Sequence, residues 1–540
     1  MLYILFMLIM LLPTLAGIGA LSAKLFTTPN FGLALTILNG IFFCTIIWTV
    51  FAFFFPLSIY VEIVTLIFGI LLFFYFKIYL QFWEFISKNT FVLLFVTLII
   101  VFVGSYYPFI LDHFGYYVPT IKWLSEVGLV KGISNLDLML GQMSLWHIFQ
   151  AGFSHFADSF LRINVLVLIV YLIYILEKKS WIHLFFLPVL FVLSQSPSPD
   201  LPVIVFSLII LNEIFTSNKN SAFLISFSIF VFAIKPTVIW LPMFTFFYSF
   251  IILRGNLKSL FFGILVMIQF LFKNIWTFGF PIFPVQFLDF GFSWKPNLDL
   301  LKNSSEIAIV KTFDTQYNYA EILQFSSWDY FKNWLMLDGI KGIINIFFIL
   351  ILMVFFIYTI FKKSKLIWSL FISIIIKSIV VFLFSAQYRF FAEVFFVIFF
   401  VLFIGVFSKK LSVIIFGVLA IFFAGFLSFP SAVTTFLPSF KLGNYITGFN
   451  ASQFYKPSYF ALKKYKTHQV GNLKFNVVDG YIYNFETPIP TISPHYIYED
   501  LEAGIFPQLK GKTLQEGFIW REMTIEEKKK LTVILKDFQN

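Results

Sequence analysis

Charged side chains and cysteine are scarce in this chain. Only 12% of its 540 residues are charged, whereas 60% are hydrophobic and 81 are phenylalanine. Soluble domains carry roughly 25% charged residues, so this composition excludes a soluble globular protein and indicates a polytopic integral membrane protein. The single cysteine, Cys44, lies inside an apolar run. One cysteine excludes an intrachain disulfide and a Cys-based metal site.

The formal net charge of +11 does not indicate a nucleic-acid partner. The Lys and Arg residues fall in short turns between apolar runs, where they act as topology signals. The first apolar run, 2–23, has no basic residue before it and Lys24 after it, unlike a signal peptide with a positively charged start. We therefore expect a retained span with its N-terminus outside.

Long apolar runs fill most of the chain up to residue 427. A spanning helix needs about 20 apolar residues, so the polar clusters divide this part into about fourteen spans. The predicted spans are approximately 2–23, 32–55, 57–76, 89–107, 160–176, 181–194, 201–215, 221–235, 237–253, 259–276, 343–361, 366–385, 390–408 and 411–427. At Lys235 and Pro236, one long kinked helix is the alternative to two spans.

Basic residues support this division, because the positive-inside rule places excess Lys and Arg in alternate, cytoplasmic turns. The residues in those turns are Lys24, Lys77, Lys88, Lys178, Lys179, Lys219, Arg254, Lys258, Lys362, Lys363, Lys365, Lys409 and Lys410. The remaining connections are then external, namely 108–159, 195–200, 277–342, 386–389 and the tail from 428 onward.

Two external loops are too long to be plain connectors. In 108–159, Pro119 suits a first helical position and Gly128 supplies a stop, which predicts a helix lying on the outer leaflet. A second surface helix is expected over about 134–156. The loop 277–342 is long, aromatic and proline-bearing, and its segments FPIFPVQF at 280–287 and SWKPN at 293–297 are expected to form a packed, non-helical cap over the membrane part.

From residue 428 the composition becomes mixed and polar. Alternating residues at 472–485 indicate strands, and Thr524 with Glu527 has the spacing of a capping box before a helix at about 525–537. The fold class is therefore an all-α polytopic transmembrane bundle with outer-face juxtamembrane helices and a small C-terminal α+β external domain. The predicted divisions are a three-span module (1–88), a transmembrane core with both external loops (89–427) and the external domain (428–540).

The first outer loop holds the residues most suited to chemistry. Asp112 directly follows a predicted span and is either a general base or a carboxylate that ends the helix. His113, His147 and His155 lie in the same loop, but no regular ligand spacing links them, so no metal site is predicted. Asp200 lies in the tight outer turn SQSPSPDLP, where it either stabilises the turn or faces a ligand.

Basic side chains gather on the same predicted side. Lys235, Lys273 with Asn274, and Arg389 each begin or end a span there, and Lys131 lies in the first outer loop. Snorkelling explains each cation taken alone. Four cations from distant sequence positions would together bind a phosphate or pyrophosphate.

These residues favour a site that holds a carboxylate base beside a lipid-linked phosphate. Inverting glycosyl transfer needs a base that deprotonates the acceptor hydroxyl and cations that stabilise the departing phosphate. Asp112 suits the first role and the basic residues suit the second, with His113, Tyr117 and Asp200 as further substrate-binding residues. Lys377 lies nearer mid-span, where it is expected to be structural or to pair with an acid.

This layout resembles the GT-C class of membrane glycosyltransferases, in which an acidic residue in a large outer loop forms the catalytic centre. More closely, the chain resembles a family of largely uncharacterised bacterial polytopic proteins related to that class. The matching pieces are DHFGYYVPTIKWLSEVGLVKGISNL at 112–136, SPSPDLP at 196–202, KNIWTFGFPIFP at 273–284, SWKPN at 293–297, YRF at 388–390 and LQEGFIWREM at 514–523.

The resemblance implies an enzyme of the bacterial inner membrane with its C-terminal domain on the periplasmic or extracellular side. It would transfer a sugar from a polyprenyl-phosphate carrier to a cell-envelope glycan or lipid acceptor. Asp112 would be the acceptor-activating base, with Lys273, Asn274 and Arg389 near the carrier phosphate. The chain has Asp112-His113 where the class has paired acids, which puts a divalent metal ion in doubt; the metal stays an open alternative, and no metal ligand and no certain cofactor is assigned. Three extra spans also precede the loop.

Two other functions remain open. A lipid-linked oligosaccharide flippase or transporter would need polar residues threading several spans toward the cytoplasm, and apart from Lys377 the sequence offers few. An O-antigen-type polymerase would also act on the outer face of the membrane and would also use an arginine in its site. Deleting such a polymerase would change the length of the glycan chain rather than prevent the addition of one sugar residue.

Overall fold

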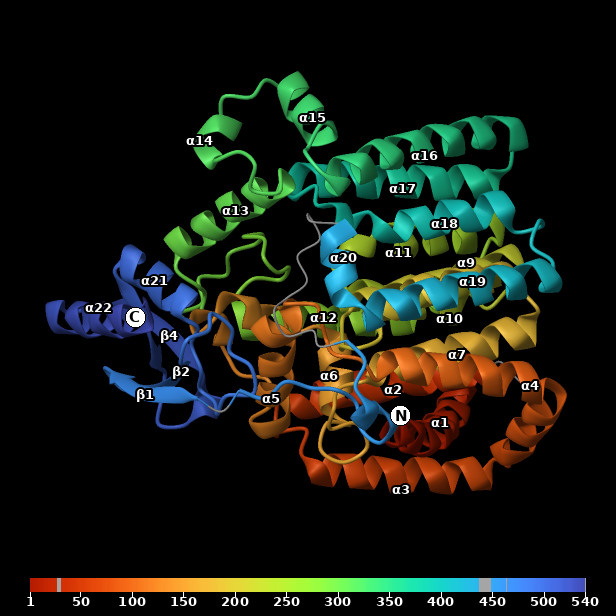
Figure 1. Ribbon diagram of the computed structural model, residues 1–540, viewed down its shortest axis with the longest axis horizontal. Coiled ribbons are helices and arrows are strands. Elements are labelled where there is room, and N and C mark those ends of the chain that lie inside the picture. Colours follow the sequence, from red (N-terminus) through yellow and green to blue (C-terminus); the bar gives the residue numbers. More distant parts are fainter. Residues whose placement is uncertain (27–30, 437–447, 463, 540) are drawn as a thin grey trace.

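The computed structural model describes residues 1–26, 31–436, 448–462 and 464–539. Seven helices within these ranges are long and apolar enough to cross a membrane. They are α1 (Leu2–Ala23), α2 (Leu33–Ala52), α4 (Ile78–Gly104), α12 (Phe261–Phe278, preceded by the short η8, Leu257–Leu260), α16 (Ile340–Lys362), α17 (Lys365–Phe384) and α19 (Lys409–Ser428). They lie together in one bundle (Figure 1) and indicate a membrane-embedded protein.

The predicted count of fourteen spans is not supported. The other seven predicted segments are helical but shorter, namely α3 (Ile59–Tyr75), α7 (Ile163–Lys178), α8 (Ile182–Val189) with η5 (Leu190–Leu193), α9 (Asp200–Phe215), α10 (Ser221–Ile234), α11 (Trp240–Phe247) with η7 (Tyr248–Ile252), and α18 (Ala392–Phe403). Helix α7 has 16 residues, which at 1.5 Å per residue gives about 24 Å, less than the roughly 30 Å hydrocarbon core. Most of α7, α9 and α10 is buried inside the bundle, so these helices need not match the bilayer.

The chain forms two helices around Lys235 and Pro236 rather than one kinked helix. Helix α10 ends at Ile234, Lys235 is extended with φ −149°, and α11 begins at Trp240 after the short η6 (Pro236–Val238). The residue before a proline is disfavoured in the helical conformation. The break therefore leaves Lys235 at one end of the bundle.

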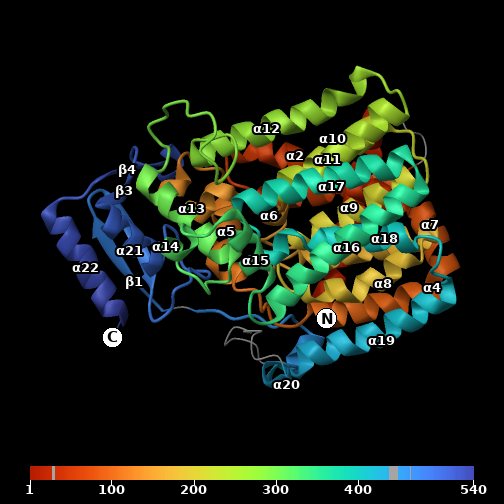
Figure 2. The same cartoon turned by 90° about the horizontal axis from the view of Figure 1, so that it is seen from above.

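The bundle has two chemically different ends. The turns before α4, after α16 and before α19 lie at one end, and they carry Lys77, Lys363 and Lys409 (Figure 1). The C-terminal domain, α5 (Val118–Glu126) and α6 (Leu145–Ala151) lie at the other end, here called the domain end (Figures 1 and 2). The predicted separation of the basic turns from the long loops is therefore present in the fold.

The first outer loop contains the helix predicted in its first half, but that helix, α5, is mostly buried in protein and does not lie on the outer leaflet. Helix α5 has Pro119 in its first turn and ends before Gly128, whose φ of +97° suits glycine. The second predicted helix, 134–156, is wrong in extent, because it is divided into η3 (Ile133–Asn135), η4 (Leu138–Gln142) and α6. The side chains of Asp137 and Ser144 cap backbone N–H groups and start new elements there.

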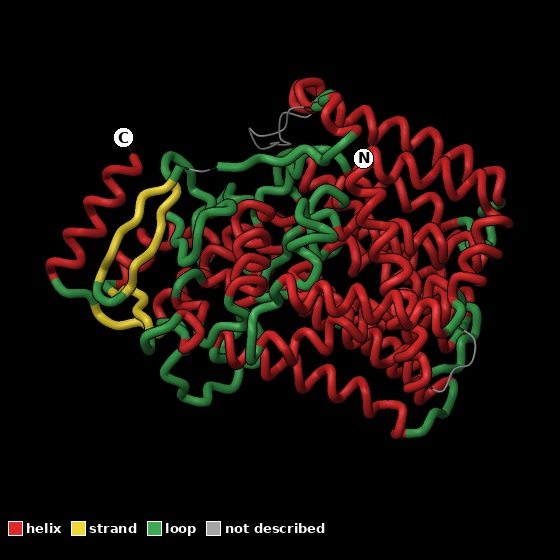
Figure 3. The backbone as a smooth tube through the Cα atoms, turned by 90° about the horizontal axis from the view of Figure 1, so that it is seen from below, coloured by secondary structure: helices red, strands yellow, loops and turns green. Residues whose placement is uncertain are grey.

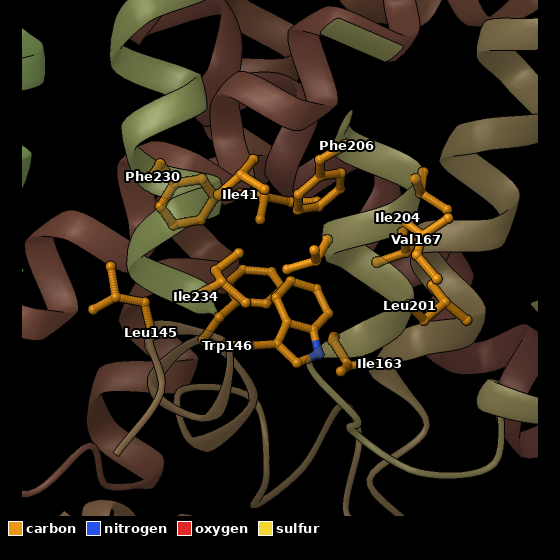
Figure 4. Packing of buried hydrophobic residues seen from close by; sticks show 14 of the residues in the cluster. Ile41, Leu145, Trp146, Ile163, Val167, Leu201, Ile204, Phe206, Phe230 and Ile234 are labelled. Carbon is orange, nitrogen blue, oxygen red and sulfur yellow. The ribbon is translucent and has the colours of Figure 1, made fainter. Parts of the chain in front are cut away.

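Helix α6 is buried in protein and does not lie on the outer leaflet. The ring of Trp146 packs near Ile163 and Ile234 (Figure 4) and is fully buried. Its indole N–H donates to Asn164 Oδ1 at 2.9 Å, which compensates the cost of burying that polar group. Trp146 thus fixes the outer loop to the bundle.

The expected non-helical structure is present in the first part of the loop 277–342, where residues 279–297, with FPIFPVQF and SWKPN, contain no helix. The rest of the loop is helical, which was not predicted. It contains α13 (Leu298–Thr312), α14 (Tyr319–Ile322) and α15 (Ser327–Leu335). Asn297, Asn318 and Ser326 cap the starts of these helices with their side chains. The prolines that suggested irregular structure all precede Asn297, so they leave the helical segments intact.

The C-terminal region contains two separate antiparallel sheets. Strand β1 (Tyr465–Val470) pairs with β2 (Leu473–Val478), and β3 (Ile505–Leu509) pairs with β4 (Phe518–Glu522). The helical elements of this region are α20 (Pro430–Phe436), η10 (Ala451–Phe454), α21 (Pro494–Ala503), η11 (Leu514–Glu516) and α22 (Ile525–Gln539). The strands are confined to one end of the molecule, and loops lie between them and the bundle (Figure 3).

The predicted capping box of the last helix is confirmed. The Glu527 N–H donates to Thr524 Oγ1 at 3.3 Å, and the Thr524 N–H donates to Glu527 Oε2 at 2.9 Å. This reciprocal pairing satisfies two backbone donors at the start of α22. The strands and helices confirm a small α+β region, while the divisions at 88 and 427 stay predictions.

Candidate functional site

Asp112 lies where the chain leaves the bundle and turns into the domain end. It directly precedes η2 (His113–Tyr117), a turn of π-helix that runs into α5. Such turns are rare and occur often at functional sites. They shift the phase of the following side chains, so Asp112 and Tyr117 both lie close to helices that are distant in sequence.

Two carboxylate–cation pairs form at the domain end. Arg389 Nη1 lies 3.1 Å from Asp112 Oδ2, and Lys235 donates to Asp200 Oδ1. Arg389 lies in η9 (Tyr388–Phe390) between α17 and α18, and Asp200 begins α9. The four side chains are 13–44% exposed. Both pairs are therefore accessible to a ligand.

One aromatic ring joins the two pairs. Lys235 Nζ and Arg389 Cζ each lie 5.1 Å from the centroid of the Phe390 ring. Both cations thus contact the same side chain, which gives a favourable cation–π interaction and holds them close together. We call Asp112, Asp200, Lys235 and Arg389, with Phe390, the two-pair site.

Tyr117 lies beside both carboxylates. Burial raises its pKa well above the usual value, and the negative charges of Asp112 and Asp200 raise it further. Its hydroxyl also interacts with Ser198, two residues before Asp200. Tyr117 therefore stays protonated within the electrostatic influence of both acids.

Asp200 supplies the second acid that the sequence did not place next to Asp112. The sequence nominated both residues, but it linked Asp112 to His113 alone. Both carboxylates act electrostatically on Tyr117 and on Arg389, and Tyr117 contacts Ser198 just before α9. No local sequence signal reports such a contact, since it depends on how α9 packs.

The other predicted phosphate ligands are engaged elsewhere. Lys131 Nζ lies over the rings of Trp276 and Trp294, at 4.3 and 5.0 Å from their centroids. Lys273 is buried and donates to the carbonyl groups of residues 142 and 143, at 2.5 and 3.1 Å. Asn274 donates to the Pro281 carbonyl at 2.8 Å. Among the described residues, no hydrogen bond or ion pair joins these three to the two-pair site, so two of the four predicted cations meet there.

The histidines of the outer loop take different positions. His113 is 6% exposed and lines a cavity together with Arg162. His147 is buried with its ring centroid 4.9 Å from that of Tyr117. His155 contacts the Leu57 carbonyl through Nε2 at 3.2 Å. They do not form a common ligand set.

The donor set at the two-pair site does not fit a divalent metal ion. Within the ranges that the structure describes, no group of three or more His, Cys, Asp or Glu side chains could hold a metal. The carboxylates of Asp112 and Asp200 already face Arg389 and Lys235, and these cations would repel a second positive charge. The site is better suited to an anion that meets both cations.

A further ion pair supports the segment that carries Arg389. Lys377 on α17 lies 2.8 Å from Glu393 on α18 and donates to the Phe390 carbonyl. Both side chains are at most 5% exposed. The sequence predicted that Lys377 would be structural or would pair with an acid, and the structure shows the pair. Glu393 was not singled out, because a carboxylate at the start of a helix is common.

A family model described as a domain of unknown function (DUF8201) matches residues 1–396. The match includes the four charged residues of the two-pair site and ends before α19. No curated protein and no solved structure matches the chain.

Proposed function

Because the chain belongs to the family described as a domain of unknown function (DUF8201), we propose its function from the geometry of the two-pair site. The protein acts as a membrane glycosyltransferase of the GT-C type. It transfers a sugar from a polyprenyl-phosphate carrier to a hydroxyl group of a cell-envelope glycan or lipid. The observation that carries this proposal is the meeting of two carboxylate–cation pairs on one aromatic ring, partly exposed at the end of an apolar bundle.

The two pairs provide the groups that such a transfer needs. A donor phosphate would take the place of the carboxylates as partner of Arg389 and Lys235, which frees Asp112 to accept a proton. Asp112 then takes the proton of the acceptor hydroxyl as that oxygen bonds to the anomeric carbon. The bond between this carbon and the phosphate oxygen breaks, and its electron pair stays on the phosphate. Arg389 and Lys235 neutralise the departing phosphate.

We place the domain end on the outer face of the bacterial inner membrane. The support is the position of the basic turns, which gather at the opposite end and would face the cytoplasm by the positive-inside rule. In this orientation the carrier chain stays in the bilayer beside the apolar helices. Its phosphate reaches Arg389 at the rim of the bundle, where this side chain is 44% exposed.

Replacement of the base tests the proposal. Asp112→Asn keeps the size of the side chain but removes its ability to accept the proton, so transfer should fall by about 10²–10⁴-fold. In a deletion strain complemented with this variant, the unused lipid-linked sugar should accumulate on the outer face and the surface glycan should lack the residue. Both are measured by extracting the lipid-linked sugars and analysing the glycan.

Asp314→Asn is the matched control. Asp314 is also a partly exposed carboxylate paired with a lysine, Lys341, but it lies in the 277–342 loop, and its replacement should leave transfer unchanged. Full transfer by a normally inserted Asp112→Asn protein would sink the proposal. Accumulation on the cytoplasmic face would instead indicate a flippase, and a change in glycan chain length alone would indicate a polymerase.

A further inference from the structure

A cavity of about 220 Å³ lies where the C-terminal domain meets the outer loop. Its walls come from 113–114, 118, 159–162, 459–460 and 485–486. Pockets for drug-sized ligands measure roughly 300–1,000 Å³. This cavity is smaller, so it suits one compact unit of a larger molecule.

Hydrogen bonds between the two regions hold the cavity in shape. The Phe485 N–H donates to the Phe114 carbonyl at 3.1 Å. Lys122 donates to the carbonyl of residue 486 at 2.9 Å, and Arg162 Nη2 donates to the Ser458 carbonyl at 2.6 Å. The C-terminal domain is therefore part of the cavity wall. The cavity exists only while that domain is docked.

The charge of the cavity wall is already compensated. Arg162 is fully buried, and its guanidinium donates to carbonyl groups through all three nitrogens, at 2.6–3.3 Å. The neighbouring Asp158 is fully buried as well and accepts from the Arg162 N–H at 2.8 Å. Glu486 adds an exposed carboxylate at the rim. Among the described residues of the wall an anion would find no uncommitted cation, so the wall favours a neutral ligand.

His113 offers a polar contact in this wall. The ring is 6% exposed, and its buried Nδ1 has no hydrogen-bond partner among the described residues. Burial, with the charges of Arg162 and His147, holds its pKa well below the usual value. The ring is therefore neutral and has one donor and one acceptor nitrogen. A buried polar atom of this kind is normally satisfied, and a hydroxyl group can satisfy either nitrogen.

Aromatic rings form the rest of the wall. Phe114, Phe460 and Phe485 lie around the cavity with ring centroids 5.0–6.3 Å apart. They offer an apolar surface beside the polar edge of His113. A sugar ring combines an apolar face of C–H groups with hydroxyl groups at its edge, so it matches both parts of the wall.

We propose that this cavity binds one neutral sugar ring, with a hydroxyl on the His113 ring and its apolar face on the phenylalanines. The proposal rests on the transfer reaction above for the origin of the ring, which belongs either to the acceptor or to the lipid-linked donor. His113 is the residue next to Asp112 in the chain, so one wall of the cavity belongs to the same segment as the base. The C-terminal domain then contributes directly to substrate recognition.

Sugar binding to the full-length protein in detergent tests the cavity. The probes are methyl glycosides of common hexoses and N-acetylhexosamines, observed by saturation-transfer NMR. Ser159 is an exposed residue of the wall whose backbone N–H donates to the Tyr3 hydroxyl. Ser159→Trp keeps that hydrogen bond and fills the cavity, so the saturation signal should fall to background. Ser305→Trp places the same side chain on the exposed face of α13, outside the cavity, and should leave the signal unchanged.

Two results would overturn the proposal, namely no bound glycoside or equal binding by the Ser159→Trp protein. Asp112→Asn separates this outcome from failure of the transferase proposal. If the protein binds sugar and Asp112→Asn retains full transfer, only the transferase proposal is rejected. If Asp112→Asn loses transfer and no sugar binds, only the cavity proposal is rejected.

Hexose 1-phosphates identify the source of the ring. If the phosphate strengthens binding and Arg389→Gln removes this gain, the ring belongs to the donor; if the phosphate has no effect, it belongs to the acceptor.

Discussion

Lys377 is a lysine buried inside a membrane helix, and we expect the stability of the protein to depend on its pairing with Glu393. It pairs with Glu393 at 2.8 Å, with 0% and 5% of the two side chains exposed. Removing one member of a buried pair leaves the other charge uncompensated, at a cost of about 3–5 kcal/mol. Lys377→Met should therefore lower the thermal stability strongly, and Lys377→Met with Glu393→Met should recover most of the loss.

Cys44 makes this measurement simple, because it is the single cysteine and is buried in α2. A thiol-reactive dye then reports unfolding by its reaction with Cys44 as the detergent-solubilised protein is heated. Equal melting temperatures of the single and double variants would show that the ion pair does not govern stability. The double variant also shows whether the Phe390 carbonyl needs the Lys377 donor to hold Arg389 in place.

Individual residues of the site were predictable, whereas their pairing was not. Asp112, Asp200, Lys235 and Arg389 each stood out as polar groups at the end of an apolar run. Lys131 and Lys273 stood out for the same reason, yet Lys131 lies over two tryptophans and Lys273 donates to two carbonyls. Sequence position shows which end of the bundle a cation reaches. It does not show which partner the cation meets there, because that depends on tertiary packing.

At the scale of elements, α1 and α2 pack through glycines at close range. A Cβ at Gly40 of α2 would overlap the Leu15 carbonyl oxygen of α1. Backbone atoms cannot move aside as a side chain can, and small residues allow this kind of approach between membrane helices. Gly40→Ala should therefore separate the two helices and destabilise the protein by about 1–3 kcal/mol.

Gly417 in α19 provides the matched control for Gly40. A Cβ at Gly417 has nothing within 4 Å, so Gly417→Ala should be neutral or stabilise its helix by up to about 1 kcal/mol. Heating samples before size-exclusion chromatography measures the folded fraction of each variant. Equal effects of the two substitutions would contradict the packing argument.

Helices were the best predicted elements, and their roles were the least certain. Apolar runs gave the position of α7, α9 and α10, because apolar sequence favours helix in a membrane protein. Hydrophobicity alone could not show that these helices are too short to span. In the loop 277–342 the prolines indicated the non-helical first part, but no helix was predicted from the caps Asn318 and Ser326, which begin α14 and α15.

At the scale of the whole molecule, buried acids join the C-terminal domain to the outer loop. Asp137 of the outer loop is 2% exposed and accepts from Asn484 Nδ2 at 3.3 Å. Tyr496 also interacts with it, and Asp500 and Glu499 of α21 place further negative charge nearby. The docked state therefore brings several carboxyl groups together at one interface.

Burial raises the pKa of Asp137 to about 7, and the charge of Glu499 adds to this rise. The pKa values of Glu499 and Asp500 are also raised, mainly by burial. An exposed aspartate titrates near 3.9, so the docked state holds more protons than an undocked one between about pH 4 and pH 7. Docking is then strongest below this window and weakens as the pH rises through it. The effect of Asp137 is on the order of 4 kcal/mol at one pKa unit per 1.36 kcal/mol.

Limited proteolysis of the C-terminal domain across the pH range tests this linkage, with the protease rate corrected by an unstructured peptide at each pH. Cleavage should be faster at high pH, and Asp137→Asn should reduce the difference because it removes one titrating group. Glu527→Gln is the control, since the hydrogen bond from Arg521 holds the pKa of Glu527 at about 2, below the window. This variant should speed cleavage equally at every pH.

A cleavage rate that falls as the pH rises would show that the carboxyl groups are ionised in the docked state. The cavity beside His113 needs this docking, so sugar binding should weaken over the same pH range.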